Sequence, residues 1–200
     1  MLAFSLWALC ATRANAADTT YERAEDWLLL LSGAVTGLVL HEAGHLTFDL
    51  IMNNQPELRP VRLGPLPFFA IAPTGIESRQ ELYGAAMMGF FVEAVYTEVI
   101  FASYPDLRSH HRPFLEGMLA LHFLLDLGYA ITGIAGIGPR ESDVNSMARS
   151  ARVSPAAIGM MLALPLAFDL MRYLQPGTRS RSLWVGASTR FLMFGAVFFL

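Results

Sequence analysis

The sequence has little charge and almost no cysteine. Only 16% of its 200 residues are charged, whereas a soluble domain usually carries about a quarter. The net charge is -3 and the arginines form no basic stripe, so the sequence does not indicate a nucleic-acid-binding protein. The single cysteine, Cys10, excludes an internal disulfide bond and a zinc site built from several cysteines.

Apolar residues take the place of the missing charge. They make up 54% of the chain, and the mean hydropathy is +0.43. Five apolar segments have lengths near the roughly 20 helical residues that cross a bilayer. These segments are residues 27–52, 83–104, 114–138, 155–174 and 183–200. We therefore predict an all-α integral membrane protein, a bundle of about five transmembrane helices in the lipid bilayer, and we expect it in a bacterial inner membrane.

The first 16 residues form a separate apolar run that ends in Ala14-Asn15-Ala16. A short apolar run before small residues resembles a secretory signal peptide cleaved after Ala16. The first arginine, Arg13, follows the run instead of preceding it, so a truncated first membrane helix is the alternative. In that case the bundle would have six helices. Residues 17–200 are predicted to form a single membrane-embedded domain.

Two connections differ from ordinary short loops. Residues 53–80 include LRPVRLGPLPFFAIAP, whose four prolines predict an extended or re-entrant segment. Such a segment is tolerated at membrane depth only where protein or water covers its backbone. Residues 138–155 are polar, and Ser142 is a suitable N-cap for a short surface helix. Pro165, inside the fourth apolar segment, predicts a kink there.

The stretch GLVLHEAGHLTFDLIM, at residues 37–52, places ionisable groups inside a predicted membrane helix. His41 and His45 are four residues apart and share one helix face, so both can bind one tetrahedral zinc ion. Glu42 would lie beside the metal, where it can exchange protons with water and a leaving amine. Gly44 leaves room for a neighbouring backbone. The alternative, two histidines hydrogen-bonded within the bundle, is disfavoured because intramembrane ionisable groups are costly.

A catalytic zinc usually has three protein ligands, so one ligand is missing from this helix. Asp49 shares the histidine face but lies about 12 Å along the helix from His41, which is too far for the same ion. Each remaining candidate could equally be a buried polar group that a neighbouring helix satisfies. The spacing of the residues leaves the choice open. The candidates on the second and third segments are Glu93, Glu98, His122 and Asp126.

This order of motifs resembles the site-2 protease family of intramembrane zinc metalloproteases. Members have HExxH in one membrane helix, a partly extended connection, G-x-x-x-N in the next helix and L-D-G in a third. Here GFFVE stands at residues 89–93 and LDLG at residues 125–128, so the similarity covers about residues 30–135. The second motif has one extra residue and lacks the asparagine and prolines that usually precede it, and Glu93 replaces the asparagine of the first.

The resemblance implies a zinc-dependent metalloendopeptidase that cleaves membrane-spanning or juxtamembrane segments of membrane-protein substrates. Glu42 would be its general base. Glu93 would contact the substrate strand or, as the downstream glutamate does in gluzincins, act as the third ligand. His122 is a further alternative ligand. The residues that the resemblance assigns to zinc are His41, His45 and Asp126.

Three other functions use the same residues. A membrane zinc hydrolase could act on lipids or small amides with the same ligands. A non-enzymatic membrane protein could use zinc to join its helices, or could carry a decayed site. A soluble secreted peptidase would need a very apolar core, and five long apolar segments argue against it. Exchange of Glu42 for glutamine separates hydrolysis from a structural role, because only hydrolysis needs the base.

Overall fold

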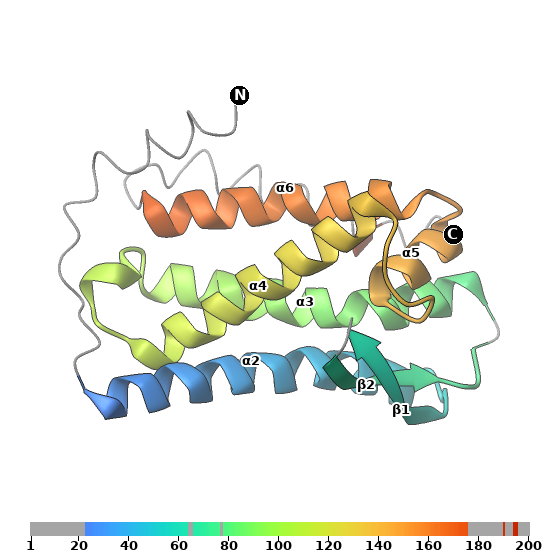
Figure 1. Ribbon diagram of the computed structural model, residues 1–200, viewed down its shortest axis with the longest axis horizontal. Helices are drawn as coiled ribbons and strands as arrows, with labels where there is room; N and C mark the ends of the chain where they lie inside the picture. The colour runs from blue at the N-terminus through green and yellow to red at the C-terminus, as the bar shows by residue number, and fades with distance from the viewer. Residues whose placement is uncertain (1–22, 64–65, 77, 176–189, 191–193, 196–200) are drawn as a thin grey trace.

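The computed structural model describes residues 23–63, 66–76, 78–175, 190 and 194–195. This part of the chain folds as a bundle of four long α-helices with a β-hairpin and a short helix at one end (Figure 1). The predicted segment 1–16 and most of the predicted fifth helix, 183–200, lie outside the described residues. The elements in chain order are α2 (Ala24–Ile51), β1 (Pro56–Leu63), β2 (Leu66–Pro73), α3 (Arg79–Ser103), η1 (Leu107–Ser109), α4 (Pro113–Ala135), α5 (Asp143–Ala151) and α6 (Pro155–Leu174).

The four long helices have the length and composition of membrane spans. They contain between 20 and 28 residues, and each carries a strongly apolar stretch. Large apolar side chains point away from the bundle on all four, as a lipid environment requires. Examples are Leu28, Val99, Leu124 and Met160, which are each between 59% and 68% exposed. The predicted all-α membrane bundle is therefore confirmed for the described helices.

Helix ends are set by local capping. The N-cap Ser78 and Glu81 form a capping box, so α3 begins at Arg79, four residues before the predicted start. Helix α4 ends at Ala135 because Gly136 adopts a left-handed conformation with φ of +66°, and the prediction had carried this helix to residue 138. The predicted role of Ser142 is confirmed, since its hydroxyl accepts a hydrogen bond from the backbone N–H of Asn145 at the start of α5.

Glycines allow the long helices to approach closely. A Cβ atom at Gly33 of α2 would lie 1.9 Å from the carbonyl oxygen of Phe114, and one at Gly117 of α4 would lie 1.9 Å from that of Leu30. The two backbones are therefore in direct contact where α2 and α4 cross. Helix α4 also packs along α6, so it joins the two sides of the bundle, as its oblique path in Figure 1 shows. Small residues at such crossings are typical of membrane helix pairs.

The proline-rich connection forms an antiparallel two-stranded hairpin. Strand β1 pairs with β2 from Pro56 opposite Pro73 to Leu63 opposite Leu66. The predicted extended segment is thus present. Both strands contact α2, and the hairpin stands beside the C-terminal part of that helix (Figure 1). Within the described residues the sheet has only these two strands, so each strand keeps one unpaired edge.

Helix α6 has the bounds predicted for the fourth apolar segment. It continues through Pro165 without a break in its helical assignment. The kink expected at this residue stays a prediction. The buried face of α6 includes Asp169 and Arg172, two charged residues inside an apolar bundle.

Candidate metal centre

Three potential ligand atoms converge where α2 meets the start of α5. The Nε2 atoms of His41 and His45 lie 3.1 Å apart. Each of them lies 3.7 Å from Oδ2 of Asp143. Zinc bonds of about 2.0–2.1 Å at tetrahedral angles place neighbouring ligand atoms about 3.3 Å apart. These two nitrogens and one oxygen therefore fit one shared zinc ion.

The face of α2 that carries the two histidines is made of small and polar residues. Gly37, Gly44 and Asp49 share this buried face with them, at the spacings expected of one side of a helix. A Cβ atom at Gly44 would lie 2.6 Å from the carbonyl oxygen of Met88. The room that the sequence predicts at Gly44 is therefore filled by the backbone of α3.

Gly89 of α3 stands directly over the imidazoles. A Cβ atom there would lie 2.5 Å from Nε2 of His41 and 2.6 Å from Nε2 of His45. No real side chain tolerates such contacts, so a glycine at this position keeps the ligand atoms accessible. Glu93 follows one helical turn later on the same face of α3. Gly89 and Glu93, the two ends of the GFFVE stretch, thus both lie beside the candidate metal centre.

The other nitrogen of each imidazole has its own partner. Nδ1–H of His45 donates to the backbone carbonyl oxygen of Ala85 at 2.6 Å. Nδ1 of His41 lies 3.1 Å from Oε1 of Glu93. Metal-binding histidines usually direct their outer N–H to a carbonyl or a carboxylate, which fixes the ring and leaves the inner nitrogen free for the ion. The ring of His45 follows this arrangement, whereas Nδ1 of His41 faces the carboxylate of Glu93 without forming a hydrogen bond among the described residues.

Asp143 reaches the histidines because α5 is held firmly against the bundle. The residue is the first of α5, directly after the N-cap Ser142. The guanidinium of Arg79, at the start of α3, donates to the carbonyl oxygen of Ser150 near the end of α5. Burial alone would raise the pKa of Asp143, but the charges of His45 and His41 outweigh the effect of burial, so its pKa lies below the ordinary value. The side chain is therefore an ionised carboxylate at neutral pH.

Two aromatic residues enclose His41. The ring of Tyr129 on α4 stacks on the imidazole with a centroid distance of 6.2 Å and an interplanar angle of 14°. Phe90 presents its edge at 5.5 Å. Tyr129 also lies close enough to the carboxylate of Asp143 to lower its pKa. Tyr129 thus lies beside both His41 and Asp143.

Glu42 follows His41 directly on α2. Its carboxylate is close enough to interact electrostatically with His45, His41 and Asp143, and it lies near the backbone N–H of Ile71. Ile71 belongs to β2, so the hairpin positions the glutamate beside the ligand atoms. The side chain is only partly buried, and it can therefore exchange protons with water.

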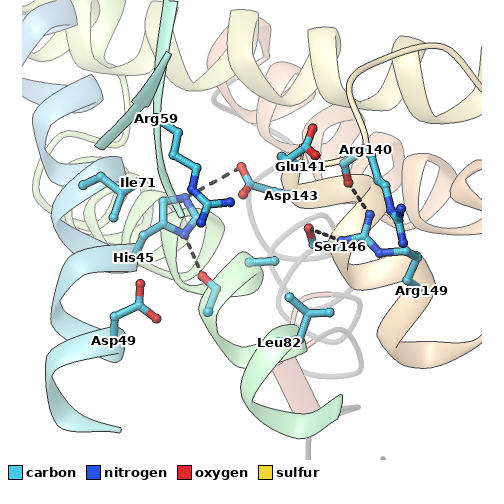
Figure 2. A pocket seen from close by; sticks show the side chains of 12 residues that line it. His45, Asp49, Arg59, Ile71, Leu82, Arg140, Glu141, Asp143, Ser146 and Arg149 are labelled. Atoms are coloured by element: carbon cyan, nitrogen blue, oxygen red, sulfur yellow. Dashed lines mark hydrogen bonds and ion pairs between the residues drawn. The ribbon is translucent and has the colours of Figure 1, made fainter. Parts of the chain in front are cut away.

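A cavity of about 230 Å³ opens beside the ligand atoms. Figure 2 shows His45 and Asp143 facing each other on one side of it, with Ile71 from the hairpin close by. Arg59 from β1 reaches over the same space, and Arg149 of α5 stands on the opposite wall. The cavity thus gives a solute access to the ligand atoms from the hairpin side.

The structure does not bring Asp126 to the histidine pair, which corrects the predicted ligand set. Asp126 belongs to a separate buried group with Glu93 and His122, between α3 and α4. The side chain of Glu93 separates the two groups, because Oε1 lies 3.1 Å from Nδ1 of His41 and Oε2 lies 3.5 Å from Nδ1 of His122. Asp143 is the carboxylate that is grouped with the two histidines.

The other predicted candidates also have defined positions. Glu93 faces the outer nitrogen of His41, so it supports a ligand instead of supplying one to the histidine pair. Glu98 pairs with the guanidinium of Arg172 at 2.7 Å and 3.0 Å. Asp49 is buried and accepts a hydrogen bond from the side chain of Asn54 at 3.1 Å. As expected from its distance, Asp49 is not grouped with the histidines.

Sequence reasoning missed Asp143 and Tyr129. Asp143 lies in a polar connection, whose composition predicted only a short surface helix. The LDLG stretch at residues 125–128 directed the prediction to Asp126 instead. Tyr129 follows that motif directly and carries no signal of its own.

No family model, no curated protein and no solved structure matches this chain. The chemistry of the site must therefore be inferred from its own residues.

Proposed function

We propose that the protein is a zinc-dependent endopeptidase that cleaves membrane-spanning or juxtamembrane segments of other membrane proteins, similar in its chemistry to the site-2 proteases. The observation that carries the proposal is the convergence of His41, His45 and Asp143 beside an accessible cavity, with Glu42 next to them. The four apolar helices make it a membrane protein. We further propose the bacterial inner membrane as its location.

The number of candidate ligands favours a catalytic zinc site over a structural one. Among the described residues three ligands converge here, two imidazoles and one carboxylate. Structural zinc sites usually have four protein ligands, whereas catalytic sites have three and keep one position open. A zinc ion held by these residues would supply Lewis-acid chemistry, which polarises a carbonyl group and makes water more acidic.

Glu42 would move the proton. It would take a proton from the water molecule whose oxygen forms a bond to the carbonyl carbon of the scissile amide. The C–N bond then breaks, and Glu42 would deliver the same proton to the leaving nitrogen. One water is consumed, and the products are a carboxylic acid and an amine. The backbone N–H of Ile71 would hold Glu42 in place during both transfers.

The Glu42→Gln variant tests this proposal. Glutamine keeps the size of the side chain but cannot accept the proton, so zinc should stay bound while cleavage falls about 10²–10⁴-fold. The measurement is cleavage of a reporter with one transmembrane helix containing glycine and proline, by purified protein with its zinc content determined in parallel. Glu116→Gln, a buried carboxylate outside the two ligand groups, is the matched control. Wild-type cleavage by a zinc-loaded Glu42→Gln variant would rule out the proposal.

The hairpin is the element that would present a substrate. A membrane-spanning helix hides its carbonyl groups, so it must become extended before hydrolysis, and an extended peptide can add to an unpaired strand edge. Strand β2 contacts the base through Ile71 and has one unpaired edge among the described residues. We infer that the hairpin binds the unwound segment beside Glu42.

Replacement of residues 60–67 by glycine and serine, with the length kept, tests the role of the hairpin. None of the three zinc ligands lies in this stretch, so the zinc content should equal that of the wild type. Cleavage of the same reporter should fall more than about tenfold, because the strand that binds the substrate is lost. A wild-type cleavage rate in this variant would show that the hairpin does not bind the substrate.

A further inference from the structure

A second polar group lies deeper in the bundle than the histidine pair. Its side chains come from α3, α4 and α6 and have almost no exposed area. They take no part in the proton transfers described above. Five of these residues, each at most 5% exposed, are Glu93, Thr97, His122, Asp126 and Asp169.

The geometry at His122 is that of ligand atoms around a common centre. Nδ1 of His122 lies 3.5 Å from Oε2 of Glu93 and 3.6 Å from Oδ2 of Asp126. These distances are too long for good hydrogen bonds. They are close to the separation of about 3.3 Å expected between neighbouring ligands of a tetrahedral zinc. One ligand atom from each residue lies within 4.8 Å of the others.

The opposite nitrogen of His122 faces a carboxylate. Nε2 lies 3.2 Å from Oδ2 of Asp169, so Nε2–H donates to this oxygen. In a neutral imidazole the lone pair is then on Nδ1 and points at the oxygens of Glu93 and Asp126. Three electron-rich atoms would repel one another unless a metal ion or protons lie between them. Metal-binding histidines typically direct their outer N–H to a carboxylate in this way.

Several polar atoms around this centre have no hydrogen-bond partner among the described residues. They are Nδ1 of His122, Oδ1 of Asp126, Oγ1 of Thr97 and both carboxylate oxygens of Glu93. Buried polar atoms in native proteins are nearly always hydrogen-bonded or bound to an ion. Such unsatisfied atoms around one centre, on side chains from two helices, indicate that a ligand belongs there.

The nearby arginines do not neutralise this centre. The guanidinium of Arg172 pairs with Glu98 at 2.7 Å and contacts Asp169 at 3.4 Å. Arg190 also pairs with Glu98 and Asp169. Two positive charges thus compensate two carboxylates, which leaves the two negative charges of Glu93 and Asp126. A divalent cation would compensate both.

We propose that Glu93, His122 and Asp126 form a second, fully buried site for a divalent transition-metal ion such as Zn²⁺. One imidazole and two carboxylates suit zinc and its neighbours in the first transition row. Glu93 then joins the two centres, since Oε1 faces His41 and Oε2 faces the second site. An ion in the second site would fix the carboxylate that orients His41. The proposal does not depend on peptidase activity.

The zinc content of the purified full-length protein tests the proposal. The protein would be saturated with Zn²⁺ in detergent, freed of excess metal and analysed for zinc per chain. We expect two equivalents in the wild type and in the Glu116→Gln control, which alters another buried carboxylate of α4. We expect one in Asp126→Asn. A His45→Ala/Asp143→Asn double variant lacks the first site and should also keep one.

The double variant decides the result even if Asp126→Asn fails to fold, because it leaves the second group intact. One equivalent of zinc in the double variant supports the second site. One equivalent in the wild type together with none in the double variant overturns it. In that case protons on His122 and Asp126 must neutralise the group. Co²⁺, whose visible absorption reports ligand geometry, gives an independent count of the two sites in the same variants.

Discussion

Asp143 is the residue on which the candidate metal centre depends. It supplies the only carboxylate oxygen that the described residues bring close to both Nε2 atoms. Its position results from a sequence of local features, from the left-handed Gly136 that ends α4 to the N-cap Ser142 that starts α5. A ligand set of two histidines from one helix and one carboxylate from a later segment is common among catalytic zinc sites.

Asp143→Asn should remove this ligand with little change of shape. The neutral amide is a much weaker zinc ligand than a carboxylate, so the affinity of the histidine site should fall more than about a hundredfold. Competition with a chromogenic chelator measures that affinity. Glu116→Gln is the matched control, since Glu116 is a buried carboxylate outside both ligand groups. Equal losses at the histidine site in both variants would contradict the assignment of Asp143.

At this scale the sequence predicted the motif residues but not their partners. His41, Glu42 and His45 could be assigned because helix spacing alone puts them together. Asp143 lies almost a hundred residues later, and only the packing of α5 against α3 brings it to the site. Asp126 was one of several candidates for the third ligand, and its helix directs it toward Glu93 and His122. Local patterns do not determine which side of α4 faces the histidines.

Among the elements, α3 contributes most to the candidate site, although the HExxH motif lies on α2. Its first turn binds α5 through Arg79, its middle accommodates the imidazoles at Gly89, and Glu93 faces the outer nitrogen of His41. The sequence predicted this helix and the place of Glu93 on it. It did not predict that Gly89 lies against both rings, because a close contact between two helices depends on their crossing.

Gly89→Ala tests the role of this close contact. A methyl group 2.5 Å from Nε2 of His41 would force the rings or the helix to move, so zinc affinity should fall at least about tenfold. Gly128→Ala, on α4, is the matched control because no atom lies within 4 Å of its added Cβ. Chelator competition on both purified variants measures the difference. Unchanged affinity in Gly89→Ala would show that Gly89 is not required for zinc binding.

At the scale of the whole molecule, the bundle has a polar interior and an apolar surface. Leu31 and Val35 of α2 are exposed to the surroundings, whereas His41 on the same helix is buried. In soluble proteins the interior is apolar and the surface polar, and the composition predicted the opposite arrangement found here. The described membrane spans begin and end within a few residues of the predicted ones. The helix crossings were not predictable, since glycines such as Gly33 and Gly117 show their function only when the facing backbone is known.

The place of α5 in the molecule has one more consequence. Asp143 follows the end of α4 by eight residues, and His45 lies roughly 9 Å from the end of α2. Both therefore belong to the rim of the bundle and not to its middle. If the protein is the proposed endopeptidase, a substrate helix would have to unwind only in its outermost turns to reach this site. The new chain ends would then lie close to the aqueous boundary, so a long apolar fragment would not have to leave the lipid.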